Sequence, residues 1–376
     1  AQAYLADGIT EDVTADLVGI QWIFVISRSS AFTYKGANVS VAEVSRELGV
    51  RYVVEGSVRK VGERVRVTAQ LIDAIRDAHV WSDRYDRDLG DLLDLQSEIS
   101  EQILGALGVE IHEAEFARLR RKPTRSLSAY EAFIRGLGHW RKLTREGYAK
   151  ARSHFERAIE LDPEFAAAYA SLAASYVWEA LIRCPFDLKV LPRARELALR
   201  ALALDPFEPM GHFALASLAA AEGRMEDAMA AGERAVELAP SSDIMRTALG
   251  AALLGRGRTF EAIGQFRRAL RLSPRPLPPF QGFLAYASYM TGNHDRAIAL
   301  WERARAANPD VIPARVMLAS HYEGLGQHEK ARGLVQEVLR GNPDCTADAA
   351  AGAMADFLGP EATRDLRDRL VRAGFP

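Results

Sequence analysis

The chain contains few of the residues that mark secreted, membrane-spanning or nucleic-acid-binding proteins. Its 376 residues include only two cysteines, Cys184 and Cys345. Two cysteines are too few for a disulfide framework, and their separation favours reduced thiols and a cytoplasmic location. No apolar run reaches the roughly 18 residues that a membrane-spanning helix needs. The formal net charge of −2 gives no general attraction to nucleic acid or anionic lipid, so direct membrane insertion and nucleic-acid binding are not expected.

Patterns that carry catalysis or metal binding are also missing. The glycines at 255, 257, 324 and 326 lack the lysine of a phosphate-binding loop and are predicted to form turns. His321 and His328 lie outside any zinc-binding pattern and are interpreted as surface histidines. In the run 83–88 the acids alternate with arginines, which predicts mutual neutralisation rather than a metal site. We therefore expect no catalytic residue, no metal site and no cofactor.

Prolines recur along most of the chain at a nearly constant spacing. Successive intervals are 43, 34, 34, 35 and 34 residues, between Pro163, Pro206, Pro240, Pro274, Pro309 and Pro343. Proline cannot continue a preceding helix but fits the first turn of the next one. Alanine keeps the same register: twelve residues before the prolines stand Ala151, Ala194, Ala228, Ala262, Ala297 and Ala331. Small residues at a fixed position allow two helices to approach closely, so the pattern predicts repeated helix pairs.

This period resembles that of tetratricopeptide repeats, helix–turn–helix units that stack into a right-handed superhelix. The resemblance implies about six repeats over 128–343, with an insertion near 181–191 that explains the interval of 43. Residues 344–376 are predicted to form C-terminal capping helices, with Leu366, Leu370 and Val371 on the buried face.

The first 110 residues follow a different pattern, typical of a small α+β domain. Ile9, Val13 and Leu17 predict a helix that Gly19 ends in the left-handed conformation, and residues 22–26 predict a buried strand. A capping box at Ser40 opens a second helix, which Gly49 closes. Strands are predicted over 51–59, 64–72 and 78–85, and a further helix over 92–107. The basic segment 111–127 is interpreted as a helical linker between the two parts.

Several segments of this domain resemble the TolB-amino-domain-like module of bacterial signalling proteins. They are the stretches 4–12, 30–36, 52–59, 69–74 and 81–87. In that family the module is commonly followed by tetratricopeptide repeats, and preceded by a class III adenylate or guanylate cyclase domain or by a winged-helix regulator with a membrane span. A periplasmic location is the alternative if such a span lies upstream. The family's opening strand is absent here, which predicts a free sheet edge and possible self-association through it. Arg76-Asp77 also replaces a turn that usually carries glycine.

In tetratricopeptide solenoids the first helix of each repeat lines the concave groove. The family's inward-facing positions fall on nine large residues that we predict to contact a partner: Trp178, Met210, Phe213, Ile244, Leu254, Tyr286, Tyr289, Met290 and Val316. No repeat carries the lysine and asparagine of a carboxylate clamp, which excludes that mode of chaperone binding. An apolar groove favours a protein or peptide with an apolar or amphipathic segment. The alternative is a groove filled by the chain's own C-terminal helices.

These observations favour a non-catalytic interaction and sensory region of a bacterial signalling protein, one that regulates an attached nucleotidyl cyclase. A sensor region of a winged-helix transcriptional regulator and a free-standing scaffold for envelope or complex assembly remain open alternatives. The sequence contains no set of catalytic residues that would indicate an enzyme, and no basic stripes that would indicate an RNA-binding repeat.

Overall fold

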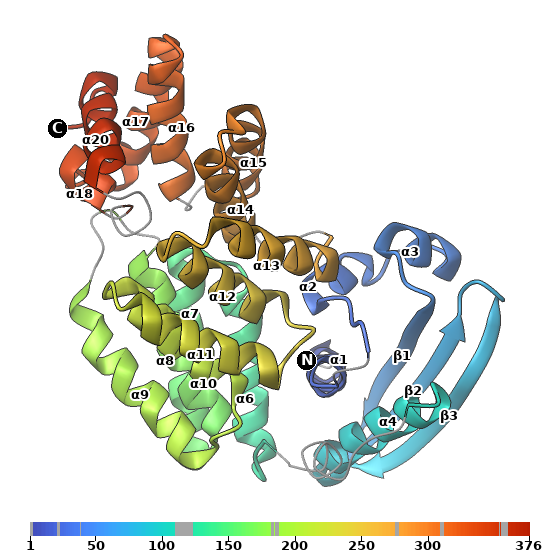
Figure 1. Cartoon of the computed structure of the whole chain (residues 1–376). Helices are drawn as coiled ribbons and strands as arrows, with labels where there is room; N and C mark the ends of the chain where they lie inside the picture. The colour runs from blue at the N-terminus through green and yellow to red at the C-terminus, as the bar shows by residue number, and fades with distance from the viewer. Residues whose placement is uncertain are drawn as a thin grey trace.

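The chain folds into a small α+β unit followed by paired helices (Figure 1). The computed structural model describes residues 3–20, 23–37, 39–109, 123–181, 184, 188–274, 278–308, 312–352, 354 and 360–376. The predicted linker 111–127 therefore lies largely outside the described residues. None of the helices in the described ranges combines the length and apolar character needed to cross a bilayer.

The N-terminal unit contains one antiparallel sheet of three strands in the order β1-β2-β3, among the described residues. The strands are β1 (Tyr52–Val61), β2 (Arg64–Asp73) and β3 (Ala78–Asp88), and the helices are α1 (Ala3–Val18), α2 (Arg28–Ala31), α3 (Val41–Leu48) and α4 (Leu92–Ala106). The predicted caps of α3 are confirmed: Ser40 Oγ accepts a hydrogen bond from the Glu43 backbone N–H, and Gly49 has a φ of 67°. Asp77, in the turn between β2 and β3, has a φ of 50°.

The alternation of β2 decides which side of the sheet forms a core. Val65, Val67, Ala69 and Leu71 are buried, whereas the residues between them face outward. Helices α1 and α4 cover the buried face. Burial of the predicted apolar stripe of α1, Ile9, Val13 and Leu17, completes this core.

Two predictions for the segment after α1 are wrong. Residues 23–26 form no strand, and Trp22, the first residue of the predicted strand, lies outside the described residues. Two hydrogen bonds connect this segment to the solenoid. The Ser241 hydroxyl donates to the carbonyl of Ile23, and the Ser27 N–H donates to the carbonyl of Leu272. Gly19 does not adopt a left-handed conformation. Residues 3–7 belong to helix α1 and add no strand to the sheet, so self-association through a free sheet edge stays a prediction.

The second part of the chain consists of six successive antiparallel helix pairs in the described ranges. They are α6 (Leu127–Trp140) with α7 (Arg145–Leu161), α8 (Ala166–Leu181) with α9 (Leu191–Leu204), α10 (Pro209–Ala221) with α11 (Met225–Leu238), α12 (Asp243–Gly255) with α13 (Thr259–Leu272), α14 (Pro278–Met290) with α15 (His294–Ala307), and α16 (Ile312–Gly324) with α17 (His328–Gly341). Four of the turns within pairs use a glycine with φ between 72° and 76°: Gly223, Gly257, Gly292 and Gly326. The turn interpretation of Gly257 and Gly326 is thereby confirmed, whereas Gly255 and Gly324 are the last residues of α12 and α16.

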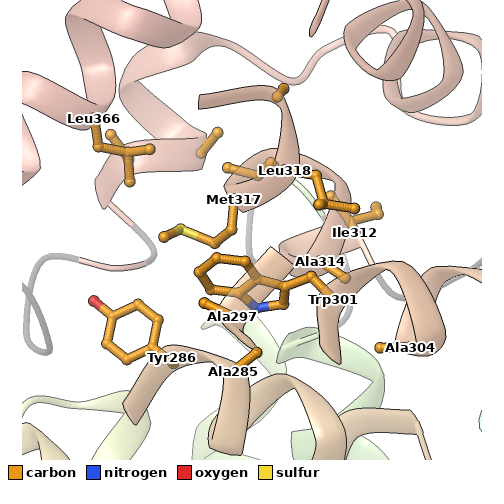
Figure 2. Packing of buried hydrophobic residues seen from close by; sticks show 14 of the residues in the cluster. Ala285, Tyr286, Ala297, Trp301, Ala304, Ile312, Ala314, Met317, Leu318 and Leu366 are labelled. Carbon is orange, nitrogen blue, oxygen red and sulfur yellow. The ribbon is translucent and has the colours of Figure 1, made fainter. Parts of the chain in front are cut away.

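The periodic small residues lie where the helices of a pair meet. All six alanines that precede the prolines by twelve residues are fully buried. Large side chains fill the space between successive pairs. Trp301 packs among Ala285, Ala314 and Met317 in the C-terminal pairs (Figure 2). The proline and alanine periods of the sequence thus correspond to a packing pattern that repeats from one helix pair to the next.

The C-terminal end is covered by α18 (Ala347–Gly352) and α20 (Pro360–Ala373), which pack on each other and on the last helix pair. Leu366 and Leu370 are buried as predicted, but Val371 is 45% exposed. Phe375 is buried beyond the end of α20 instead, because the chain turns at Gly374 and returns to the cap. There the Pro376 carbonyl accepts a hydrogen bond from the Ala347 N–H.

Replacing Leu370 with alanine tests this cap. We expect Leu370→Ala to lower the free energy of unfolding by about 2–5 kcal/mol, since it opens a cavity at a fully buried position. Val371→Ala is the matched control and should change stability by less than about 1 kcal/mol, because that side chain is half in water. Urea denaturation of both variants measures the difference, and equal losses would contradict the assigned face.

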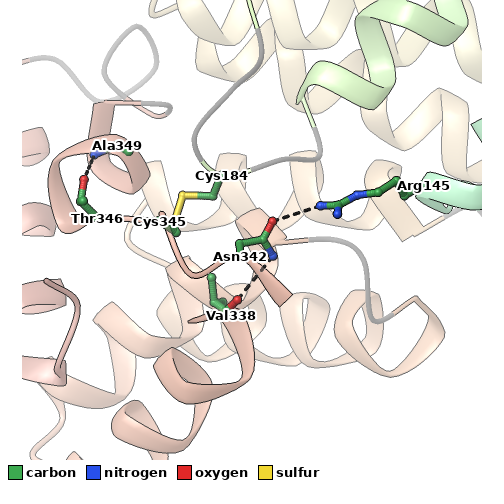
Figure 3. The surroundings of a disulfide bond; sticks show 7 residues. All are labelled: Arg145, Cys184, Val338, Asn342, Cys345, Thr346 and Ala349. Atoms are coloured by element: carbon green, nitrogen blue, oxygen red, sulfur yellow. Dashed lines mark hydrogen bonds between the residues drawn. A yellow bond between two sulfur atoms is a disulfide. The ribbon is translucent and has the colours of Figure 1, made fainter. Parts of the chain in front are cut away.

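The two cysteines form a disulfide, which overturns the prediction of separate reduced thiols. Cys184 and Cys345 are 161 residues apart in sequence, yet their Cα atoms lie 5.1 Å apart (Figure 3). The superhelix brings early and late repeats together, which repeat spacing along the sequence does not reveal. Two hydrogen bonds accompany the bridge: Arg145 donates to Asn342 Oδ1, and Asn308 Nδ2 donates to the carbonyl of Leu143.

Reduction of this bridge should lower stability by about 2–5 kcal/mol, since the cross-link closes a loop of more than one hundred residues. Thermal unfolding with and without a phosphine reductant measures the effect. The Cys184→Ala/Cys345→Ala variant is the control and should unfold at one temperature in both buffers. If the wild type, purified without reductant, shows two free thiols in a thiol assay under denaturing conditions, the bridge does not form.

Candidate docking cleft

The nine predicted groove residues divide into a buried and an accessible set. Trp178, Phe213, Leu254, Tyr286 and Val316 are each at most 8% exposed and pack between helices. The Trp178 and Phe213 rings stack on each other with centroids 5.9 Å apart. These five side chains pack inside the solenoid, so they offer a partner no open surface. An aspartate in place of Phe213 or Tyr286 would be a buried charge.

The accessible set consists of Met210, Ile244, Tyr289 and Met290. Tyr289 already contacts the rings of Trp301 and His321. Met210 and Ile244 differ from the other two because they line a cleft of about 1380 Å³ between the N-terminal unit and the solenoid. We call this space the docking cleft. Its walls come from α1, the end of α6, and the loops that join successive helix pairs at 161–166, 204–210 and 238–245.

Helix α1 belongs to both the cleft wall and the interface between the two parts of the chain. The Tyr130 hydroxyl of α6 donates to Asp12 Oδ2 at 2.6 Å and accepts from Gln96 Nε2 of α4 at 2.8 Å. Gly8 permits this approach, since a Cβ there would lie 2.7 Å from the Tyr130 oxygen. Burial raises the pKa of Asp12 well above its usual range, and the hydrogen bond from Tyr130 opposes that rise.

Arginines join the same region through one carboxylate. Glu11 of α1 accepts a hydrogen bond from Arg141 Nη2 at 2.5 Å, and its other carboxylate oxygen forms an ion pair with Arg28 Nε at 2.7 Å. Burial lowers the pKa of Arg28 to about 10. All three side chains are at most 21% exposed. The contact thus connects α1 to α2 and to the end of α6.

The loops between helix pairs supply acids that lie beside the periodic prolines. Asp162 and Asp205 each precede a proline and accept the N–H of the residue two positions later. Glu208 caps α10 through the Met210 N–H. Glu164 is exposed at the same edge. These acids stabilise turns and helix starts.

Asp243, at the start of α12, is the most buried of these acids, at 6% exposure. Its Oδ1 accepts the Ile244 N–H, whereas Oδ2 has no hydrogen-bond partner among the described residues. Burial raises the pKa of Asp243 to about 6, against the opposing effects of the Ser273 hydroxyl, backbone amides and Arg141. Nε1 of Trp140, another buried residue of the wall, also lacks a hydrogen-bond partner in the described parts of the chain.

The histidines and the acidic run bring no metal ligands together. His328 is exposed and pairs with Glu323, as a surface histidine should. His321 is not on the surface: it is buried beside His294, Tyr289 and Trp301, and burial lowers its pKa to about 4. In the run 83–88, Asp86 pairs with Arg66 and Arg84. The described residues contain no group of three or more histidines, cysteines or acids placed to hold a metal ion.

One pattern in the sequence predicts part of the cleft wall. The acids at 162 and 205 recur at the same step of the proline period, so the repeat itself stacks them along one edge. The contribution of Glu11, Asp12 and Asp16 followed from no such pattern, because it depends on how α1 docks on the solenoid.

Comparison with known proteins confirms the repeats. Two family models described as "Tetratricopeptide repeat" match residues 191–243 and 247–312, and 288–356. Among solved structures, a tetratricopeptide-repeat protein of Thermus thermophilus is 20% identical, with a TM-score of 0.40 over 51% of this chain and 98% of that one.

Two curated relatives are longer proteins. A protein of Rhizobium meliloti named "Putative adenylate cyclase 3" is 38% identical over 231 residues, which is 60% of this chain and 39% of the relative. "Superkiller protein 3" of Schizosaccharomyces pombe is 26% identical over 195 residues, or 50% of this chain and 13% of the relative. The matched part thus spans less than half of each relative. The chain contains tetratricopeptide repeats, the units of a protein-interaction scaffold.

The raised pKa of Asp243 gives a testable pH dependence. Because the folded state holds this proton more tightly than the unfolded state, its contribution to stability is complete below about pH 4. It is lost as the pH rises to about 6. Asp243→Asn mimics the protonated form, so at pH 7.5 it should stabilise the protein by on the order of 1–3 kcal/mol and at pH 4 by nothing.

Urea denaturation at several pH values measures this difference. Asp295→Asn is the control, since Asp295 occupies the first turn of α15 in an exposed position. A stability difference for Asp243→Asn that does not change between pH 4 and 7.5 would contradict the assignment.

Proposed function

We propose that this chain is a non-catalytic sensory and scaffold region that binds a partner protein in the docking cleft and thereby regulates an attached nucleotidyl cyclase. The observation that carries the proposal is the double role of α1. One helix supplies both a wall of the cleft and the packing that joins the sheet to the solenoid. A partner in the cleft therefore touches the contact that sets how the two parts are held together.

The accessible side chains of the cleft suit a protein partner. Met210 and Ile244 provide apolar surface, and Phe207, at 53% exposure, stands at the same wall. Exposed aromatic residues beside a concave surface are frequent anchors in protein interfaces. The partner is expected to present an apolar or amphipathic segment.

The cyclase assignment is supported by the relative in Rhizobium meliloti and by the resemblance of the N-terminal unit to modules that follow class III cyclases. In this proposal a domain outside the present chain forms the cyclic nucleotide, and the present chain supplies no catalytic residue. The cyclase assignment implies the cytoplasm, whereas the disulfide between Cys184 and Cys345 favours an oxidising compartment, so a periplasmic location remains the alternative.

Phe207 and Phe260 provide a matched test of regulation through the cleft. Both are exposed phenylalanines of the solenoid, but only Phe207 lines the cleft. Phe207→Asp in the full-length gene product should change cyclic nucleotide formation in the native host by about threefold or more, since it places a charge in the partner's apolar contact. Phe260→Asp should leave the rate unchanged.

Both variants must show the same circular dichroism spectrum and unfolding midpoint as the wild type, so that a change in rate is not caused by unfolding. A full-length product that makes no cyclic nucleotide, or equal rates in the two variants, would overturn the proposal.

A further inference from the structure

Strand β3 forms one edge of the sheet, on the side that faces away from the solenoid (Figure 1). In an antiparallel ladder the backbone groups of a strand point alternately to its neighbour and outward. The Leu89 N–H, just beyond β3, donates to the carbonyl of Glu63, in the register that pairs β2 with β3. The odd-numbered residues of 82–89 therefore bond to β2, and the N–H and carbonyl groups of the even-numbered residues point outward.

These outward-pointing groups have no further strand to pair with among the described residues. Two of them bond instead to side chains of β3 itself. The Arg84 N–H donates to Asp83 Oδ1 at 2.7 Å, and the carbonyl of Asp86 accepts a hydrogen bond from Arg87 Nη1 at 3.5 Å. An open edge on a strand of 11 residues can pair with a strand of another chain.

The charges along this edge select the strand that fits it. Residues 83–87 read Asp-Arg-Tyr-Asp-Arg, an order that is complementary to itself in antiparallel pairing. When Tyr85 lies opposite Tyr85 of a second copy, Arg84 faces Asp86 and Asp83 faces Arg87. Each of these pairs occurs twice, because the contact is symmetric. Opposite charges that face each other across two strands stabilise their pairing.

Only this register combines the backbone bonds with favourable charges. The even-numbered residues must face one another, since their backbone groups point outward. A shift of two residues in one direction would place Arg84 opposite Arg84 of the second copy. A shift of two residues in the other direction would place Asp86 opposite Asp86. Like charges directly opposite each other are destabilising, so the edge specifies a single register.

The charged side chains of the edge are accessible to a second copy. The side chain of Arg84 is 62% exposed and that of Asp86 is 38% exposed. Asp86 also accepts a hydrogen bond from Arg66 at 2.7 Å, and Arg87 pairs with Glu98 at 3.3 Å. These contacts within the chain can persist, because a carboxylate accepts several hydrogen bonds and a guanidinium group has five donors. Pairing would therefore extend existing rows of alternating charge across the contact.

We infer that two copies of this chain associate through β3 in antiparallel register, with Tyr85 opposite Tyr85 of the second copy. The sheet then continues through both copies, and backbone partners replace the local bonds of the Arg84 N–H and the Asp86 carbonyl. The same surface is used on both copies, so the contact closes at a dimer. The inference goes beyond the proposed function and does not depend on it, since no residue of β3 lines the docking cleft.

Analytical ultracentrifugation of the 376-residue chain over a range of concentrations measures the association. The mass of the wild type should rise from one chain to two and no further. Arg84→Asp places the introduced aspartate opposite Asp86 at both ends of the contact, and Asp86→Arg places the introduced arginine opposite Arg84. Each variant alone should dimerise about tenfold more weakly or less than that.

A mixture of the two variants tests the register itself. In a dimer of one Arg84→Asp chain and one Asp86→Arg chain, the introduced aspartate faces the introduced arginine, and the remaining Asp86 faces the remaining Arg84. All pairs again have opposite charge, so the mixed dimer should form with the affinity of the wild type. Ultracentrifugation with a fluorescent label on one variant detects it. A mixture that associates no better than either variant alone overturns the inference.

Arg59→Asp is the matched control, since Arg59 is an exposed arginine of β1, at the other edge of the sheet. It should dimerise as the wild type does. Loss of the dimer in Arg59→Asp but not in Arg84→Asp would place the contact at the β1 edge and overturn the inference. A wild type that stays monomeric at all concentrations, or that forms assemblies larger than a dimer, would also overturn it.

Discussion

The architecture depends on the packing of α1 between the sheet and the first helix of the solenoid. A glycine at position 8 lets the Tyr130 hydroxyl approach α1, and the hydrogen bonds from Gln96 to Tyr130 and from Tyr130 to Asp12 join three helices. The ion pair of Glu11 with Arg141 and the hydrogen bonds of residues 23–27 to the solenoid add to this contact. The space left between the N-terminal unit and the repeats becomes a cleft with walls from both.

A second constraint acts at the other end of the solenoid. The bridge from Cys184 to Cys345, with the bonds at Asn342 and Asn308, connects the early repeats to the last ones. A repeat stack otherwise holds each unit only through its neighbours. This long-range closure adds a contact between repeats that are distant in sequence.

The cleft shows how structural residues acquire a second use. Asp205 stabilises a turn and Glu208 begins a helix, and neither role requires a partner. The stacking of the repeats places these acids along one edge of the cleft. Helix α1 adds Glu11 and Asp16 on the opposite side. The walls of the cleft are thus built from residues that already have a structural role.

The sequence alone determined the local elements and the repeat. The spacing of prolines and alanines predicted the helix pairs, and the alternation of β2 predicted its buried face, because both follow from fixed backbone periods. Tertiary structure decided what depends on distant contacts. It placed Phe213 and Tyr286 in the packing, drew residues 23–27 to the solenoid, joined Cys184 to Cys345 and buried His321. Helical periodicity gives the direction of a side chain from its helix, but superhelical curvature and domain docking determine what lies there.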